Sequence, residues 1–236
     1  MTKWIASTKW IMAALNTLAL MYLILYVAIS LPTFTMPFYN YAYNRNETHE
    51  LIGISEHDLE RVTRLLIDYM RVNTDNLDII VDIHGEQRPF FSEIEIKHMI
   101  DVQDLFRIGF IIRNIAVVLF AATFLSGFLY ERRPILKEYA RSFIYGTIML
   151  VCLGGALLAI IFSDFEYAFI IFHEIFFDND LWLLDPNIDL LINIVPLQFF
   201  VDLFIVIMAL FASIIIAFLI LCNIYLKNIR RTRGRH

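Results

Sequence analysis

Four long apolar stretches constrain this 236-residue chain more than any other feature. A helix needs ~20 predominantly apolar residues to cross the ~30 Å hydrocarbon core of a bilayer. Stretches of at least this length occupy residues 10–31, 108–130, 142–162 and 199–226. The sequence therefore predicts one α-helical membrane domain over residues 1–236, built as a bundle of four transmembrane helices.

Positive charge predicts the orientation of that bundle, because Lys and Arg in short segments beside a span mark its cytoplasmic side. The loops 32–107 and 163–198 should then lie outside, and the second contains seven acidic residues but no Lys or Arg. Both termini are predicted to be cytoplasmic. A basic cluster this close to a membrane exit indicates topology and anionic lipid rather than nucleic acid. The basic residues are Lys3, Lys9, Arg132, Arg133, Lys137, Arg141, Lys227, Arg230, Arg231, Arg233 and Arg235.

The two outer loops are predicted to form a small extracellular α/β cap. Ser55 is typical of a helix N-cap, and apolar residues follow at helical spacing over 59–70. Residues 77–83 alternate and are β-branched before a turn at Gly85, which favours a hairpin. Ser92 with a glutamate three residues later makes a capping box, whose helix can continue into the second span.

Two histidines, His98 and His173, lie in these outer segments as possible proton carriers. His98 shares a helical stripe with Asp101, so one interpretation is a satisfied polar pair in which Asp101 holds the imidazole. The other interpretation is a site in which the two histidines meet. Trp182, further along the second loop, is expected to be an interfacial anchor.

Several kinds of chemistry leave no signature in the sequence. The zincin motif HExxH lacks its second histidine after His173 and Glu174, and there is no GxSxG elbow, P-loop or CxxC. Three ligands, His98, Asp101 and His173, could still meet in space around a metal. No metal and no cofactor are expected.

Arg113 and Asp202 lie inside the predicted spans, where an ionisable side chain is costly unless it is paired or hydrated. An ion pair is the expected arrangement. The alternative is contact with the substrate or a lipid headgroup, for which the planar guanidinium of Arg113 is better suited.

Two segments resemble the bacterial lipoprotein intramolecular transacylases: KHMIDV at residues 97–102 and FHEIFFDNDLWLLDP at residues 172–186, continuing to Phe200. The resemblance implies a multi-pass protein of the bacterial cell membrane with its active site at the outer face. Its substrate would be a diacylated lipoprotein among membrane lipids. The sn-2 acyl chain would move from the diacylglyceryl-cysteine to that cysteine's α-amino nitrogen, giving a lyso-form lipoprotein without an acyl-enzyme.

The resemblance also assigns residues. His98 and His173 match the histidines expected to carry catalysis, one as general base and the other as acid or oxyanion stabiliser, in an order left open. Asp101, Trp182 and Asp185 match motif positions that could support or orient them. The rival hypotheses are a non-enzymatic membrane interaction or sensor protein, and a metal-assisted lipid hydrolase.

Overall fold

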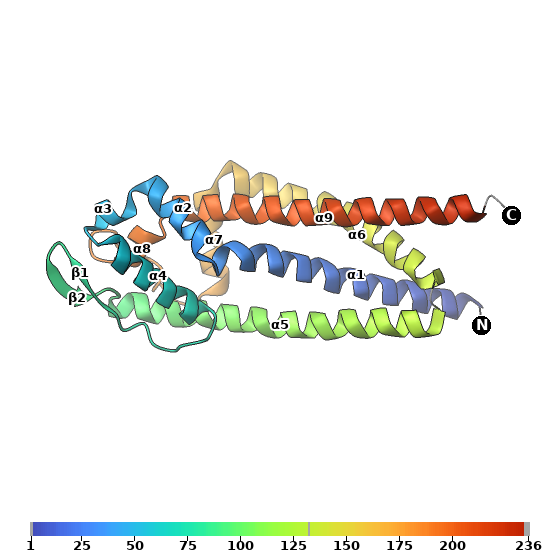
Figure 1. Ribbon diagram of the computed structural model, residues 1–236, viewed down its shortest axis with the longest axis horizontal. Helices are drawn as coiled ribbons and strands as arrows, with labels where there is room; N and C mark the ends of the chain where they lie inside the picture. Colours follow the sequence, from blue (N-terminus) through green and yellow to red (C-terminus); the bar gives the residue numbers. More distant parts are fainter. Residues whose placement is uncertain (1, 132, 234–236) are drawn as a thin grey trace. The chain divides into compact units, whose positions relative to one another are not determined.

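The computed structural model describes residues 2–131 and 133–233, which are mostly helical (Figure 1). Within these residues, four helices are long and apolar enough to cross a membrane, over Thr8–Thr33, Glu93–Gly127, Ile135–Ser163 and Leu197–Thr232. The predicted helical membrane fold with a small sheet is confirmed. In chain order the elements are α1 (Thr2–Thr33), α2 (Met36–Asn46), α3 (Thr48–Ile52), α4 (Glu56–Met70), β1 (Ile80–Ile83), β2 (Glu86–Pro89), α5 (Glu93–Glu131), α6 (Arg133–Ser163), α7 (Phe165–Phe176), α8 (Leu191–Ile194) and α9 (Leu197–Arg233).

Contacts between residues divide the chain into two compact units. We call Met1–Ala28, Ile111–Phe162 and Met208–His236 the span unit. We call Ile29–Phe110 and Ser163–Ile207 the histidine unit, because it contains both candidate histidines.

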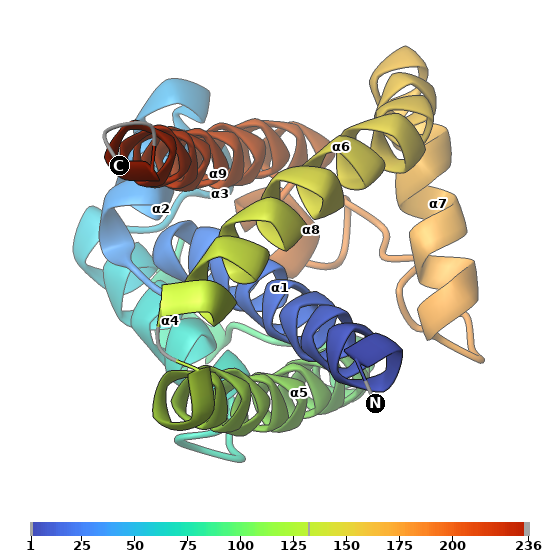
Figure 2. The same cartoon turned by 90° about the vertical axis from the view of Figure 1, so that its right-hand side faces the viewer.

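In the span unit, α1, α5 and α9 run side by side and α6 crosses them obliquely (Figures 1 and 2). Few side chains are buried there, and apolar residues such as Ile148 and Leu153 are exposed, as expected for helices that face lipid. Polar side chains link the helices. Asn16 donates to the Thr123 hydroxyl at 2.9 Å, and the Thr17 hydroxyl donates to that of Ser142 at 3.0 Å.

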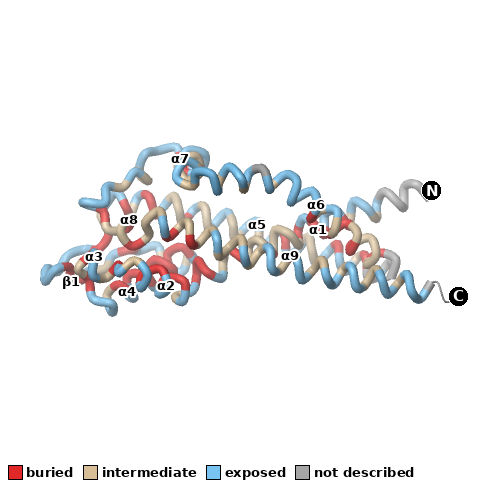
Figure 3. Tube along the Cα trace, turned by 90° about the horizontal axis from the view of Figure 1, so that it is seen from above, coloured by how far each residue is buried: buried red, intermediate tan, exposed pale blue. Residues whose placement is uncertain are grey.

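The histidine unit has a larger core, visible as the buried stretches of α2, α4 and α8 in Figure 3. The predicted cap of α4 is present, because the Ser55 hydroxyl accepts from the Asp58 backbone N–H at 3.0 Å. The apolar face of α4, including Leu59, Val62 and Leu66, is buried. Local sequence therefore specified both the start and the buried face of this helix.

The predicted hairpin is also present, with β1 and β2 antiparallel from Ile80 opposite Pro89 to Ile83 opposite Glu86. His84 and Gly85 form its two-residue turn with φ of 54° and 89°, the left-handed region that a type I′ turn requires. The strand begins at Ile80 rather than at the predicted residue 77. A side-chain turn delays it, since the Asn76 amide oxygen accepts from the Asp78 backbone N–H.

Candidate active site

The two candidate histidines meet inside the histidine unit. His98 lies in the second turn of α5 and His173 in the last turn of α7, and their ring centroids are 6.1 Å apart at an angle of 32°. The two residues are only 8% and 7% exposed. Two proton-carrying rings are thus adjacent and largely removed from water.

Aromatic side chains surround the pair. The Phe169 and Trp182 rings lie 4.3 and 4.8 Å from that of His173, and the Phe177 ring lies 5.3 Å from that of His98. Burial lowers the pKa of His173 below its ordinary value, and its hydrogen bond to the Phe169 carbonyl offsets only part of that effect. His173 is therefore neutral at pH 7.

The hydrogen bonds of the two rings differ. His173 Nδ1–H donates to the Phe169 carbonyl oxygen at 2.7 Å, one turn earlier in α7. A neutral imidazole carries one N–H, so this bond leaves the lone pair of His173 on Nε2. His98 Nδ1 is buried and has no hydrogen-bond partner within the described part of the chain.

One interpretation of the sequence had Asp101 holding the His98 imidazole, but the described residues show no hydrogen bond between these two side chains. The Asp101 carboxylate instead accepts from the Asn179 side-chain amide at 2.9 Å. Asp101 lies three residues after His98, a spacing that makes side chains neighbours on a helix. Its carboxylate nevertheless takes its donor from Asn179, in the loop after α7. Within the described residues, His98 Nδ1 has no hydrogen-bond partner. Asp101 consequently links α5 to that loop.

Trp182 and Asp185 have different positions relative to the pair. The Trp182 indole packs against His173 at a tilt of 31°, so it belongs to the wall of the site. The Asp185 carboxylate accepts from the backbone and side-chain N–H groups of Asn187 at 2.9 and 2.8 Å. These bonds close a turn in the Asp185 loop.

Two buried carboxylates hold the start of α5, and sequence reasoning foresaw only part of their role. Glu95, which is 0% exposed, accepts from the backbone N–H groups of Ser92 and Leu191. Asp189 accepts from the Ser92 hydroxyl at 3.0 Å and from the Asp185 backbone N–H at 2.9 Å. We call Ser92, Glu95, Asp189 and Leu191 the carboxylate clamp. The capping box predicted the bonds between Ser92 and Glu95, but no local signal indicated the reach to residues 189 and 191.

The predicted pairing of Arg113 with Asp202 is also wrong. Asp202 pairs with Arg45 of α2 at 2.7 Å and accepts from Gln198 at 2.9 Å. Arg113 donates to the Tyr26 hydroxyl at 2.8 Å within the span unit. The apolar pattern singled out both charged side chains, but it gave no sign that Arg45 of α2 would pair with Asp202.

Residues 2–131 and 133–233 contain no group of three or more His, Cys, Asp and Glu side chains placed to hold a metal ion. His98, Asp101 and His173 therefore do not form the ligand trio that the hydrolase hypothesis requires.

The comparison with known families is decisive. The model of the family described as lipoprotein intramolecular transacylase Lit matches residues 14–200, a range that includes both histidines. The chain belongs to the lipoprotein intramolecular transacylase family. It is therefore an acyltransferase of the membrane that acts on lipoproteins, and the predicted family and enzyme class are confirmed. A search of curated protein sequences gives no match.

Solved structures support the same fold. The lipoprotein intramolecular transacylase Lit from Bacillus cereus superposes with a TM-score of 0.74 at 18% identity, covering 98% of this chain and 100% of that one. Two Bacillus cereus variants with one histidine replaced, by alanine or by arginine, give TM-scores of 0.75 and 0.73 at 18% identity. The alanine variant covers 98% of this chain and 99% of its own, and the arginine variant covers 100% and 98%.

Proposed function

We propose that this transacylase moves the sn-2 acyl chain of a diacylglyceryl-cysteine to the α-amino nitrogen of the same cysteine. The observation that carries this proposal is the adjacency of His98 and His173, whose ring centroids lie 6.1 Å apart among aromatic side chains. The amine and the ester belong to one substrate molecule, so no enzyme nucleophile and no cofactor are needed. The product is a lyso-form lipoprotein of unchanged mass.

The hydrogen bonds of the two rings support different roles for them. With its Nδ1–H bound to Phe169, His173 presents the Nε2 lone pair and suits a general base. For His98, a buried Nδ1 without a partner costs less as a lone pair than as an N–H. His98 accordingly carries its proton on Nε2 and suits a hydrogen-bond donor.

In the proposed reaction a single proton moves from the substrate amine to His173 and then back to the substrate. The amino nitrogen attacks the sn-2 carbonyl carbon, a C–N bond forms, and His173 Nε2 takes the proton that the nitrogen loses. His98 Nε2–H donates to the oxyanion of the tetrahedral intermediate. When the C–O bond breaks, His173 returns its proton to the departing glycerol oxygen, and both histidines end as they began.

Positioning supplies more of the rate than proton transfer in this scheme. Holding amine and ester in attack geometry contributes ~7–11 kcal/mol, whereas general acid–base catalysis supplies ~10²–10⁴-fold, or about 3–5 kcal/mol. The aromatic wall formed by Phe169, Phe177 and Trp182 is therefore as relevant as the two imidazoles, because it shapes where the substrate can lie.

The site is proposed to face the outer side of the membrane. The histidine unit includes the acidic segment 163–198, while basic residues flank the opposite span ends, as the charge rule requires. The test is labelling of single cysteines in intact cells with a membrane-impermeant thiol reagent. Glu86→Cys in the hairpin should react before lysis and Lys227→Cys only afterwards, whereas the reverse order would overturn the orientation.

The reaction is tested in a bacterial host that lacks N-acylation of lipoproteins. Mass spectrometry of the N-terminal lipopeptide should show unchanged total mass, a blocked amine and one ester-linked chain. A free amine with both chains on glycerol would refute the proposed transfer.

Glutamine variants test the two roles. His98→Gln keeps an N–H donor, so it should retain more activity than His98→Ala, which is expected to lose about 10²–10³-fold. His173→Gln removes the base and should lose about 10²–10⁴-fold, with no advantage over His173→Ala. Rescue by glutamine at residue 173 instead of residue 98 would reverse the assignment.

A further inference from the structure

Helix α7 begins one residue after a helix that is long enough to cross a membrane. The candidate span in α6 ends at Ser163, and the apolar Phe162 just before it is 62% exposed. Asp164 caps the next helix, since its carboxylate accepts from the Tyr167 backbone N–H at 2.9 Å, and α7 starts at Phe165. One residue extends a chain by at most about 3.6 Å. The first turn of α7 therefore lies where the α6 span leaves the membrane.

Helix α7 runs across its neighbours in the histidine unit rather than along them. In Figure 2 the helices α5 and α9 are seen nearly end-on, whereas α7 is seen from the side. Ring contacts attach α7 to the part of α9 in the same unit. Phe165 lies 5.8 Å from Phe204, and Phe169 lies 5.0 Å from Phe200. Because α5 and α9 contain candidate spans, the axis of α7 lies along the membrane surface.

One half of the circumference of α7 is apolar and largely open. Residues three and four apart share a face of a helix, and six such positions adjoin one another here. Ile175 is 70% exposed and Phe176 is 52% exposed. We call these six residues the apolar side of α7: Tyr167, Ala168, Ile171, Phe172, Ile175 and Phe176. Apolar side chains gathered on one open helix face mark an interaction surface.

The other side chains of α7 pack against the protein or carry negative charge. Phe169 packs on α9, and His173 is buried beside His98. Glu166 and Glu174 are exposed and lie outside the apolar side. At 3.6 residues per turn, Glu166 lies half a turn away from Ile175, which is nine residues later. The helix is thus amphipathic, with its acidic residues away from its apolar side.

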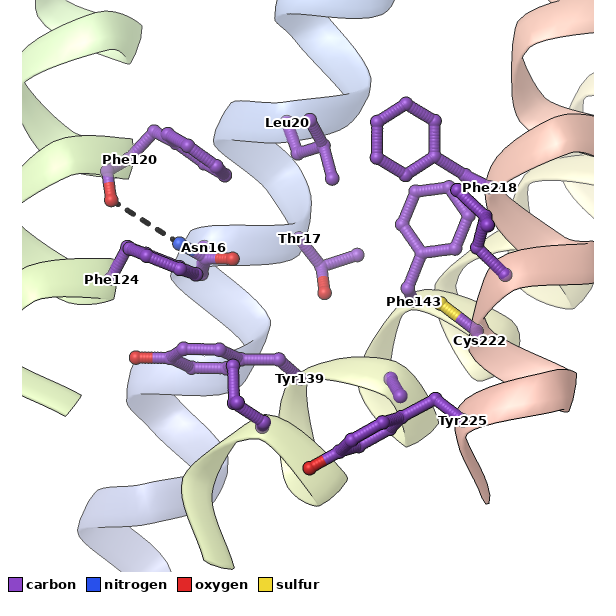
Figure 4. A pocket seen from close by; sticks show the side chains of 13 residues that line it. Asn16, Thr17, Leu20, Phe120, Phe124, Tyr139, Phe143, Phe218, Cys222 and Tyr225 are labelled. Atoms are coloured by element: carbon purple, nitrogen blue, oxygen red, sulfur yellow. Dashed lines mark hydrogen bonds between the residues drawn. The ribbon is translucent and has the colours of Figure 1, made fainter. Parts of the chain in front are cut away.

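The span unit provides a reference for side chains that meet lipid. Its polar groups lie between the helices, where Asn16 donates to the Phe120 carbonyl at 3.3 Å and Thr17 lines the same pocket (Figure 4). Open positions of α6, such as Leu153 and Leu157, are apolar. The apolar side of α7 has the same composition as these lipid-facing positions, and one residue of chain joins α7 to α6.

We propose that α7 is an interfacial helix whose apolar side is inserted among the acyl chains of the adjoining lipid leaflet. Such helices lie in the plane of the membrane, with the apolar face buried ~5–10 Å into the boundary between headgroups and acyl chains. Insertion removes the apolar side from water, and the nearest apolar phase is the bilayer that α6 has just left. Glu166 and Glu174 offer no attraction to anionic headgroups, so hydrocarbon contact holds the helix. This membrane contact is independent of acyl transfer.

Photolabelling of the unmodified protein tests the contact. The protein is placed in phosphatidylcholine bilayers that contain a phosphatidylcholine with a diazirine in its acyl chain, and mass spectrometry identifies the labelled residues. The apolar side of α7 should be labelled, as should exposed α6 residues such as Leu153, whereas the exposed strand Glu86–Pro89 should not. Adding phosphatidylglycerol should leave this pattern unchanged, because the contact is with hydrocarbon. Labelling of α6 without α7 would overturn the proposal.

Nitroxide labels on opposite sides of α7 give a matched comparison. Cys152 and Cys222 are first replaced by alanine, and Ile175→Cys and Glu166→Cys are then labelled separately in the same bilayers. Oxygen, which concentrates in hydrocarbon, should relax the label at residue 175 several-fold more strongly than a water-soluble nickel chelate does, and the order should reverse at residue 166. Equal accessibility at the two positions, or disulfide-linked dimers of unlabelled Ile175→Cys, would contradict a lipid occupant. None of these measurements uses acyl transfer, so a failure here is distinct from a failure of the proposed function.

Discussion

The helices that carry the two histidines are held in different ways. The start of α5 is fixed by the carboxylate clamp, in which Glu95 accepts from two backbone N–H groups. Helix α7 is only 12 residues long, and ring contacts attach it to α9, Phe165 to Phe204 at 5.8 Å and Phe169 to Phe200 at 5.0 Å. Hydrogen bonds therefore fix the helix that carries His98, while packing fixes the helix that carries His173.

This difference matters for the proposed substrate, a lipoprotein whose acyl chains lie in the membrane. Each ring contact contributes about 0.5–1.5 kcal/mol. The outward face of α7 is apolar and exposed at Tyr167, Ile175 and Phe176. The two histidines of the proposed site thus lie on helices that differ both in how they are held and in what they expose.

Among the variants that test how the two helices are held, Glu95→Ala is expected to have the largest effect. The change leaves the Ser92 and Leu191 N–H groups without an acceptor, at about 1–3 kcal/mol for each buried donor. Thermal unfolding should show a loss of about 2–6 kcal/mol in stability, and activity should fall further because His98 loses its support. Glu93→Ala, at an exposed position of the same turn, is the control. An unchanged thermal unfolding midpoint in Glu95→Ala would show that the carboxylate clamp does not stabilise the start of α5.

The second effect concerns pH. Because burial lowers the pKa of His173, its imidazole stays neutral down to pH values below the ordinary ~6.5. The acid limb of kcat/KM due to His173 should lie below pH 6.5 and fall about tenfold per pH unit. The unfolded chain binds this proton more readily than the folded one. The stability contributed by this group is therefore complete above ~6.5 and is lost as pH falls through the lowered pKa.

Rates measured from pH 4.5 to 8 on a synthetic lipopeptide, together with unfolding midpoints over the same range, check both statements. An acid limb above pH 6.5 that disappears in His173→Gln would contradict a lowered pKa.

A smaller effect is expected at the aromatic wall. Trp182→Ala removes the ring packed against His173, which loosens the packing around that imidazole and admits water. The rate at pH 7 should fall about two- to tenfold, equivalent to 0.5–1.5 kcal/mol. The acid limb should move up toward ~6.5 as desolvation weakens. Trp182→Phe, which keeps an aromatic ring, should stay close to the unmodified enzyme, and an equal loss in both variants would argue against this role.

The smallest effect is expected for Asp101→Asn. Its carboxylate binds Asn179 at the partly exposed surface, where such interactions contribute about 0–1 kcal/mol, so activity should fall less than about fivefold. A carboxylate that directly orients a catalytic histidine can account for about 10⁴-fold in rate. Steady-state kinetics separate these outcomes clearly, and a loss near the larger figure would restore the direct pair with His98.

Local patterns explain which parts of the molecule the sequence predicted. The N-cap of α4, the hairpin turn at His84 and Gly85, and the capping box at Ser92 each depend on residues within four positions of one another. The contacts that were missed join distant residues: Glu95 to Leu191 across 96 positions and Arg45 to Asp202 across 157. No periodicity encodes such partners, because tertiary packing selects them. The sequence pattern singled out both histidines by their position in the outer segments, and the family resemblance then assigned them to catalysis.

The aromatic wall around the histidines also bears on the fidelity of the enzyme. In the proposed reaction, water that reached the ester would compete with the amine and release a free fatty acid instead of an amide. The rings of Phe169, Phe177 and Trp182 pack against the two histidines and leave little room for such a water molecule beside them. The ratio of amide to free fatty acid among the products thus measures how dry the pocket remains during each turnover.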